Sequence, residues 1–341
     1  MDFTFGILSY NSEKYILETL NSIKYQIIHY GNGLKIQLIV ADDGSKDNTC
    51  YYVRKWTEKN GQIFERCDFL FSKENEGTVK NYNKLIAAVL GKRFSMLAGD
   101  DLYADCNLFQ LFDRFHEKEC LSSFPISLQD GRFFIETHRL ARSIYTMKHK
   151  KRDGEWLLRK EMLGSYIHTP STLFYLQDYD KETKRFVEQF ELYEDDPKWY
   201  RFLKKGIKFK FILEPFVLYR YHATSISHGK GQQGVLSAFE RDSLKLNQIY
   251  LSDSEISWFL KVFLQLKIKQ IQSRKRSFLY LMFRQADYLS CCFFNVLKGY
   301  GKEEKRQLEK IIEKNKSYYR RIVKESNRDQ EQYRGEKNAG D

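Results

Sequence analysis

Short apolar runs alternate with helical periodicity through the first third of the chain, and no other feature restricts the fold as strongly. Apolar runs at residues 3–10, 36–41, 69–72 and 94–98 predict strands. The stretches between them place apolar residues at helical spacing, as in Ile16, Leu17, Leu20, Ile23 and Ile27. Strands that alternate with helices indicate a parallel sheet covered by helices on both faces. The predicted fold class is therefore α/β, with a mostly parallel mixed sheet flanked by helices.

Polar side chains follow directly on the last apolar residue of several predicted strands. They are Asn11, Asp42, Asp43, Asp100 and Asp101. In open parallel sheets, ligands bind beyond the carboxyl ends of the strands. Because the topology gathers these ends at one edge, we expect the five side chains to lie in an active site there.

The pair Asp100-Asp101 has the chemistry of a divalent-metal site. Mg²⁺ or Mn²⁺ on a diphosphate needs hard oxygen ligands and leaves coordination positions open for phosphate oxygens. Gly99 before the pair permits a close approach of the backbone. Adjacent aspartates also cap helices or lie in solvated turns, but the preceding apolar strand favours the metal site.

The segment Asp42-Asp43-Gly44-Ser45 has two compatible interpretations. It can form a type I turn that caps the following helix. A carboxylate there can also accept a hydrogen bond from the ring N–H of uracil or thymine in a nucleotide donor.

Length, cysteine content and charge set outer limits. A chain of 341 residues exceeds what one core usually serves, so we expect one large domain with an appendage, or two domains. The six cysteines form no CxxC pair, and the sequence contains neither a signal-peptide pattern nor an apolar run near the roughly 20 residues that span a bilayer. We expect a cytoplasmic protein with at most peripheral membrane contact. The net charge of +12 suits nucleic acid, an anionic membrane or phosphorylated substrates without choosing among them.

Five motifs in order resemble glycosyltransferase family 2 across roughly residues 3 to 225. They are Ser9-Tyr10-Asn11; Val40 to Asp47; Asn75-Glu76-Gly77 with Lys80-Asn81; Leu97 to Asp101; and Tyr193-Glu194-Asp195 with Trp199 and Arg201. The resemblance implies a GT-A fold, inversion at the anomeric carbon, a divalent cation (Mg²⁺ or Mn²⁺) and a nucleotide-diphosphate sugar donor, with UDP-sugar or dTDP-sugar favoured.

The resemblance also assigns donor-site residues. The nucleoside would contact Ser9, Tyr10, Asn11 and Asp42 or Asp43. Lys80 stands where the family usually has a basic residue near the donor. Gly99, Asp100 and Asp101 match the family's DXD element, although Ala98 occupies a position where an extra Asp is often found.

Asp195 matches the family's catalytic base. A sugar hydroxyl is a poor nucleophile, and a carboxylate opposite the leaving group can remove its proton during attack. Asp196 is a rival for this role, and both would also suit the acidic start of a helix. His222, in a late segment that includes Ser225 and Ser227, is a candidate metal or phosphate contact.

The predicted organisation is a GT-A catalytic domain at 1–233 and a helical C-terminal region at 234–341 with a charged, disordered tail. Within the first, residues 1–121 would bind the nucleotide sugar, and 122–233 would hold the acceptor and the base. Residues 256–286 carry seven Lys or Arg and no acid on an aromatic-rich amphipathic pattern. This segment suits an anionic membrane surface, or equally a helix packed on the catalytic domain.

Other functions leave weaker traces. A nucleic-acid-binding protein would explain the charge, but there is no helix-turn-helix, zinc-finger or RNP pattern, so no nucleic-acid partner is expected. A nucleotidyltransferase would normally begin with a Gly-rich basic phosphate loop, which Ser9 to Ser12 is not. A degenerate transferase retained for binding stays open. The expected acceptor is a saccharide or a lipid-linked saccharide of cell-surface polysaccharide synthesis.

Overall fold

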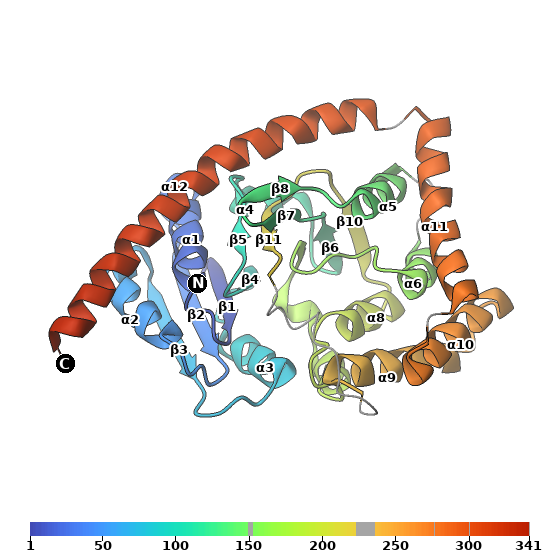
Figure 1. Ribbon diagram of the computed structural model, residues 1–341, viewed down its shortest axis with the longest axis horizontal. Helices are drawn as coiled ribbons and strands as arrows, with labels where there is room; N and C mark the ends of the chain where they lie inside the picture. The colour runs from blue at the N-terminus through green and yellow to red at the C-terminus, as the bar shows by residue number, and fades with distance from the viewer. Residues whose placement is uncertain (149–152, 223–235, 276, 300, 341) are drawn as a thin grey trace.

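A parallel sheet forms the centre of the N-terminal half. The computed structural model describes residues 1–148, 153–222, 236–275, 277–299 and 301–340. The sheet has the strand order β3-β2-β1-β4, and all its neighbouring strands are parallel. Its strands are β1 (Phe3–Ser9), β2 (Ile36–Asp42), β3 (Arg66–Phe71) and β4 (Phe94–Ala98). The α/β prediction is confirmed (Figure 1).

Helices cover both faces of this sheet because its strands are apolar on both sides. Phe5 and Val40 pack in one core with α1 (Ile16–Tyr30) and α2 (Thr49–Asn60). Ile39 packs on the other face with α3 (Thr78–Ala88). Gly6 admits α3 closely, since a Cβ there would lie 2.9 Å from a Leu85 methyl group.

Two smaller sheets extend the molecule beyond β4. One has the order β10-β6-β9 and the other β5-β11-β7-β8. Their strands are β5 (Leu102–Tyr103), β6 (Glu119–Ser122), β7 (Ile126–Gln129), β8 (Arg132–Phe134), β9 (Thr172–Phe174), β10 (Lys208–Phe211) and β11 (Val217–Arg220). The helices of this half are α4 (Leu108–Leu111), α5 (Thr137–Lys148), α6 (Gly154–Leu163), α7 (Lys181–Val187) and α8 (Asp196–Lys204), with 3-10 turns η1 (Gly61–Ile63), η2 (Phe112–Arg114) and η3 (Leu176–Asp178).

Four helices follow in the described residues from 236 onward: α9 (Ala238–Ser252), α10 (Trp258–Ser273), α11 (Phe278–Leu297) and α12 (Lys302–Gly340). Leu246 of α9 and Phe263 of α10 share a hydrophobic core with Met162 and Trp199 of the preceding half. The helical C-terminal region is therefore confirmed, and it is packed against the rest of the protein. The predicted boundary at 233/234 lies outside the described residues.

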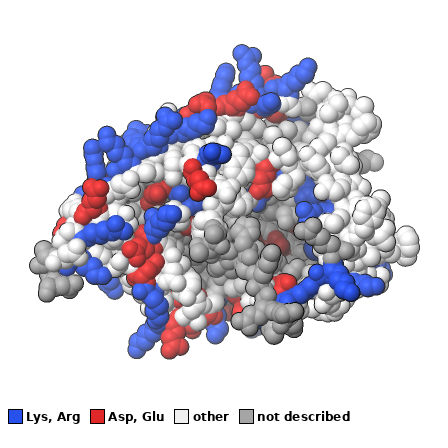
Figure 2. All heavy atoms as spheres, viewed as in Figure 1, with Lys and Arg blue, Asp and Glu red and all other residues white. Residues whose placement is uncertain are grey.

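The charged C-terminal tail, for which disorder was expected, belongs to α12, which runs back over α1 and α2 as one continuous helix (Figure 1). Its lysines and arginines gather on the outer surface (Figure 2). Its buried face repeats at steps of three, four or seven residues and mixes apolar with polar side chains: Leu308, Asn315, Tyr318, Ile322, Ser326, Asp329 and Tyr333. A search for apolar periodicity alone does not find such a face.

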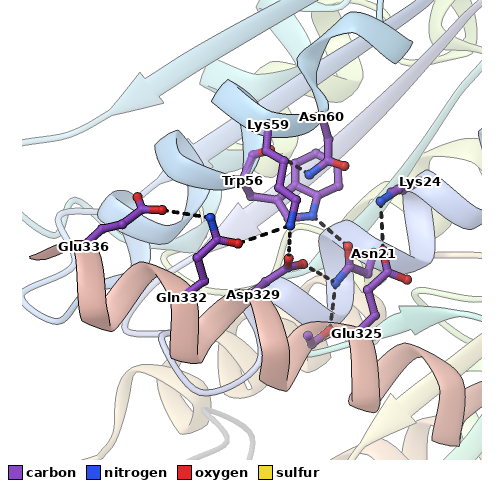
Figure 3. Close-up of polar contacts among 10 residues, drawn as sticks. Asn21, Lys24, Trp56, Lys59, Asn60, Glu325, Asp329, Gln332 and Glu336 are labelled. Atoms are coloured by element: carbon purple, nitrogen blue, oxygen red, sulfur yellow. Dashed lines mark hydrogen bonds and ion pairs between the residues drawn. The ribbon is translucent and has the colours of Figure 1, made fainter.

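Polar contacts fix α12 to the N-terminal helices (Figure 3). Asn21 Nδ2 donates to Asp329 Oδ2 at 3.2 Å and to Ser326 Oγ at 3.0 Å. The Trp56 ring nitrogen donates to Asn21 Oδ1 at 2.7 Å, and Lys59 Nζ lies 2.8 Å from Asp329 Oδ1. The C-terminal helix thus closes against helices that follow β1 and β2, the strands that begin the site.

Candidate active site

One large cavity lies at the carboxyl end of the central sheet. Its volume is about 1730 Å³. One wall, the sheet wall, comes from residues at and beyond the carboxyl ends of β1, β2, β3 and β4, together with Tyr219 of β11 and His222 after it. The opposite wall, the helix wall, comes from the segments of α5, α6 and α8 and from α9, α10 and α11. The C-terminal helices therefore help to build the site.

The turn after β2 is fixed by Asp42. Its carboxylate accepts hydrogen bonds from Ser9 Oγ at 2.7 Å, from Ser45 N at 2.8 Å and from Ser45 Oγ at 2.6 Å. Asp42 is buried and does not line the cavity. Asp42 therefore positions Ser45. The hydroxyl of Ser45 in turn accepts a hydrogen bond from Asn11 N at 2.7 Å.

Tyr10 and Asp43 both face the cavity. Tyr10 is 42% exposed, so its aromatic ring is accessible to a ligand. Each carboxylate oxygen of Asp43 accepts one backbone N–H, from Glu76 and Gly77, both at 2.9 Å. Because a carboxylate has about four lone-pair sites, Asp43 retains acceptor capacity toward a ligand. Lys80, by contrast, is exposed on α3 and lies outside the cavity.

Asp100 and Asp101 have different surroundings. Gly99, which precedes them, packs closely against Ser12, since a Cβ at position 99 would lie 2.9 Å from Ser12 Oγ. The carboxylate of Asp100 lies 2.6 Å from His222 Nε2. Asp101 is buried, and its Oδ1 accepts the backbone N–H of Arg220 at 2.8 Å. Burial, and then the charge of Asp100, raise the pKa of Asp101.

The donor atoms of Asp100 and His222 suit a divalent cation. The carboxylate oxygen and the imidazole nitrogen are in direct contact, so one cation could take both as ligands in place of their hydrogen bond, with the carboxylate as the ligand that Mg²⁺ and Mn²⁺ prefer. Within the described residues, no group of three His, Cys, Asp or Glu could hold a metal ion. A cation here would need phosphate oxygens or water as further ligands. Ser225 and Ser227 lie outside the described residues.

Carboxylates gather across the cavity where α8 begins. Asp195 is the N-cap, and its Oδ1 accepts the backbone N–H of Asp196 at 2.7 Å. Glu194, Asp195 and Asp196 all line the cavity, with Glu161 of α6 nearby. Burial, and then the charge of Asp195, raise the pKa of Glu194 to about 8 and raise that of Asp196 well above its usual range. Burial also raises the pKa of Glu161 to about 7.

Two lysines that sequence patterns did not single out accompany these acids. Lys198 is buried, with its Nζ 4.3 Å from the ring centre of Trp199 and 3.3 Å from the hydroxyl oxygen of Tyr82. Lys267 of α10 lines the cavity. Burial lowers the pKa of both lysines, and carboxylates of the Glu194–Asp196 segment oppose this effect. Their positive charges partly offset the repulsion among the acids.

The helix wall also carries a group of basic side chains that sequence patterns missed. It consists of His138, Arg139, Arg142, His168 and Arg284. Burial, and then the charges of Arg139 and Arg142, lower the pKa of His168. Among the described residues, His168 Nε2 has no hydrogen-bond partner. These residues are distant in the sequence and share no local motif, so the group becomes visible only once the fold brings them together.

The fold is GT-A-like, with a large cavity at the carboxyl edge of its parallel sheet. The chain matches the family model for glycosyl transferase family 2 over residues 4–179, which is more than half its length, and it belongs to that family. The enzyme class therefore replaces the nucleic-acid-binding and nucleotidyltransferase alternatives.

Curated relatives include other glycosyltransferases. An uncharacterized glycosyltransferase of Rickettsia prowazekii is 24% identical over 274 residues, which cover 74% of this chain and 77% of the relative. Two uncharacterized glycosyltransferases of Mycoplasma genitalium are 34% identical over 103 residues and 27% identical over 113 residues, covering 30% and 33% of this chain. The chain spans only 32% and 36% of the length of these two relatives.

Solved structures show the same fold at low sequence identity. S. aureus TarS 1-349 in complex with UDP is 16% identical, with a TM-score of 0.51, and the match covers 96% of this chain and 91% of that one. The complex of that protein with UDP-GlcNAc gives a TM-score of 0.53 at 15% identity, covering 96% and 92%. Within the described residues, none of the helices combines the length and apolar composition that crossing a bilayer requires.

The structure brings together nine of the eleven residues proposed from the sequence. The nine that line the cavity are Ser9, Tyr10, Asn11, Asp43, Gly99, Asp100, Asp101, Asp195 and His222. Asp42 lies behind the wall, and Lys80 lies outside the cavity on α3. The roles of all eleven stay predictions.

Proposed function

We propose that the enzyme transfers a sugar, with inversion, from a UDP-sugar or dTDP-sugar to a hydroxyl of a saccharide or lipid-linked saccharide. The observation that carries this proposal is the single cavity that joins strand-end Asp43 and Asp100 to the carboxylates at the start of α8. The cavity of about 1730 Å³ exceeds the roughly 300–1,000 Å³ typical of a one-ligand pocket, which suits a donor and an acceptor together. The TarS complexes with UDP and UDP-GlcNAc support the uridine form of the donor.

The sheet wall provides groups for the nucleoside. The exposed ring of Tyr10 offers a face on which a base can stack. Asp43, held by two backbone N–H groups, can accept the ring N–H of uracil or thymine with a remaining lone pair. In this proposal Asp42 acts indirectly, by fixing Ser45 and through it Asn11.

Asp100 and His222 would hold a divalent cation beside the diphosphate. When bound, the cation would neutralise charge that develops on the departing nucleoside diphosphate. Asp101 helps to position this pair, because its carboxylate accepts the backbone N–H of Arg220, two residues before His222. Arg220 in turn donates to the backbone oxygen of Asp100 at 2.9 Å.

Asp195 is the proposed general base. A base must be free of its proton before it can accept one from the sugar hydroxyl. Burial raises the pKa of Glu194 and of Asp196, which makes these two poorer candidates for an unprotonated base. Asp195 also lies at the N-terminus of α8, where a negative charge is stabilised by the helix dipole.

The experiment that tests this function is a panel of UDP-sugars and dTDP-sugars with purified protein and Mn²⁺ or Mg²⁺. Binding is followed calorimetrically, and product configuration at the anomeric carbon is determined by NMR. The proposal predicts that one donor binds, that its binding needs the cation, and that Asp100→Ala weakens it. The proposal fails if no donor binds and Asp100→Ala changes nothing.

We further propose that the enzyme works in the cytoplasm in cell-surface polysaccharide synthesis. The depth and double-sided lining of the cavity support a saccharide acceptor, since the helix wall carries many polar groups away from the sheet wall. Residues 1–121 and 122–233 remain the proposed donor and acceptor halves. Residues 234–341 complete the acceptor side through α9, α10 and α11.

A further inference from the structure

Helix α11 turns an apolar face outward. Five exposed side chains recur at steps of four, seven, four and three residues, which place them on one side of the helix: Phe278, Met282, Leu289, Phe293 and Val296. Trp258, which is 77% exposed, and Phe259 extend the apolar surface at the start of α10. Nine of the fifteen large apolar side chains that are exposed among the described residues lie between 258 and 297. We call the surface formed by these five side chains of α11, with Trp258 and Phe259, the α11 face.

The opposite side of α11 is already occupied. Tyr280, Asp287 and Cys291 are buried against the catalytic half. Asp287 accepts hydrogen bonds from Arg142, Lys160 and the hydroxyl of Tyr166. An ordinary surface helix buries its apolar side and exposes its polar side. Here a polar anchor faces inward and the apolar side remains uncovered, which marks an interaction surface.

The charges around the α11 face identify what covers it. Asp287 is the only acid between residues 256 and 299, and it is buried in ion pairs. The exposed charged residues described in this segment are basic. They include Lys261, Lys269, Lys275 and Lys298, and we call them the basic rim. In Figure 2 the right-hand surface, where α11 lies in Figure 1, is mostly white. A two-fold contact between copies would bring this basic rim close to its own like charges, whereas anionic lipids would complement it.

We propose that α11 and the start of α10 bind the surface of an anionic bilayer as interfacial helices. The exposed apolar side chains enter the boundary between headgroups and acyl chains, and the basic rim contacts the lipid phosphates. Arg284, Gln285 and Tyr288, on another side of the same helix, line the cavity. Docking therefore holds the helix wall of the cavity next to the headgroups. This last point, the presentation of a lipid-linked acceptor, rests on the proposed function, whereas the binding itself does not.

Vesicle flotation with the full chain tests the apolar part of the proposal. Vesicles of phosphatidylcholine alone are compared with vesicles that also contain phosphatidylglycerol. Leu289→Asp should lower the partition coefficient about tenfold or more, because one exposed leucine side chain leaves the bilayer interface. The matched control is Leu90→Asp, because Leu90 is 55% exposed and Leu289 is 60% exposed. The control should bind as the wild type does.

The charge arm and a spectroscopic signal complete the test. Lys269→Glu should weaken binding to the anionic vesicles about fivefold or more, whereas Lys310→Glu on α12 should not. Anionic vesicles should shift the fluorescence of Trp258 to the blue and protect it from iodide, and Trp258→Phe should remove both signals. Trp56 and Trp199 are buried in the free protein and Trp156 is half-buried, so the difference between the wild type and Trp258→Phe isolates the signal of Trp258.

Two results would overturn the proposal. They are no binding of the wild type to anionic vesicles, and equal binding by Leu289→Asp; in the second case, a wild-type dimer that Leu289→Asp converts to a monomer would assign the face to a second copy of the chain. UDP affinity, measured on the same samples, separates this inference from the proposed function. Lost vesicle binding with unchanged UDP affinity supports the proposal, and a wild type that binds vesicles but no nucleotide leaves it standing while the proposed function fails.

Discussion

The docking of α12 predicts a measurable loss of stability in Asp329→Ala. Asp329 is buried, accepts from Asn21 and pairs with Lys59. A hydrogen bond to a charged group contributes about 1.5–3 kcal/mol. The Lys59 side chain is 48% exposed, so this ion pair adds at most about 1 kcal/mol. Asn21 keeps Ser326 as a partner, so the total expected loss is about 2–3 kcal/mol.

Urea denaturation of wild type and variant, followed by circular dichroism, measures this loss as a change in midpoint at constant slope. Glu336→Ala is the matched control on the same helix, because Glu336 is 40% exposed and lies 3.4 Å from Lys55. It should lose less than about 0.5 kcal/mol. If Asp329→Ala costs no more than Glu336→Ala, α12 does not dock as described, and the reasoning about its polar buried face is refuted.

Three further predictions concern the site. Gly99→Ala should weaken donor binding in calorimetry, because its Cβ would lie 2.9 Å from Ser12 Oγ and 3.1 Å from the Ser9 Cβ; unchanged affinity would show that the turn adapts. His222→Ala should weaken cation-dependent donor binding as Asp100→Ala does. If only one of the two substitutions has an effect, Asp100 and His222 do not bind the cation together. Glu161 has a pKa raised to about 7 in the folded state, so the folded protein retains a proton that the unfolded chain loses above its ordinary value of 4.5. Stability should therefore fall as pH rises from 4.5 toward 7, by up to about 1.4 kcal/mol per pH unit from this group, and Glu161→Gln should flatten that fall in denaturation curves.

Much of the sheet and of its carboxyl edge could be predicted because the signal is local. Each strand is a short apolar run, and the residue after it is fixed at the sheet edge by the parallel topology. The strand pattern of the sequence alone therefore places Asn11, Asp43 and Asp100 together. It does not distinguish Asp42 from Asp43, because adjacent residues in a strand point to opposite sides and either could face the ligand.

The helix wall could not be predicted, because its parts are distant in the sequence and carry no shared pattern. Glu161, Lys198 and Lys267 come from α6, α8 and α10, and only packing brings their charges together. Charged composition was misleading for α12, since its buried face includes Asn315 and Asp329. The basic segment 256–286 forms α10 and the first part of α11, and both helices line the cavity.

The most direct test of the proposed mechanism compares Asp195→Asn with Asp196→Asn. Both replace a carboxyl group at the start of α8 by an amide and keep the shape of the side chain. With a UDP-sugar that the wild type turns over, UDP release and UDP affinity are measured for each protein. Asp195→Asn should slow UDP release about 10²–10⁴-fold with unchanged UDP affinity, and Asp196→Asn should retain most of the rate. Wild-type turnover by Asp195→Asn, or loss of turnover in Asp196→Asn alone, would contradict the proposed mechanism.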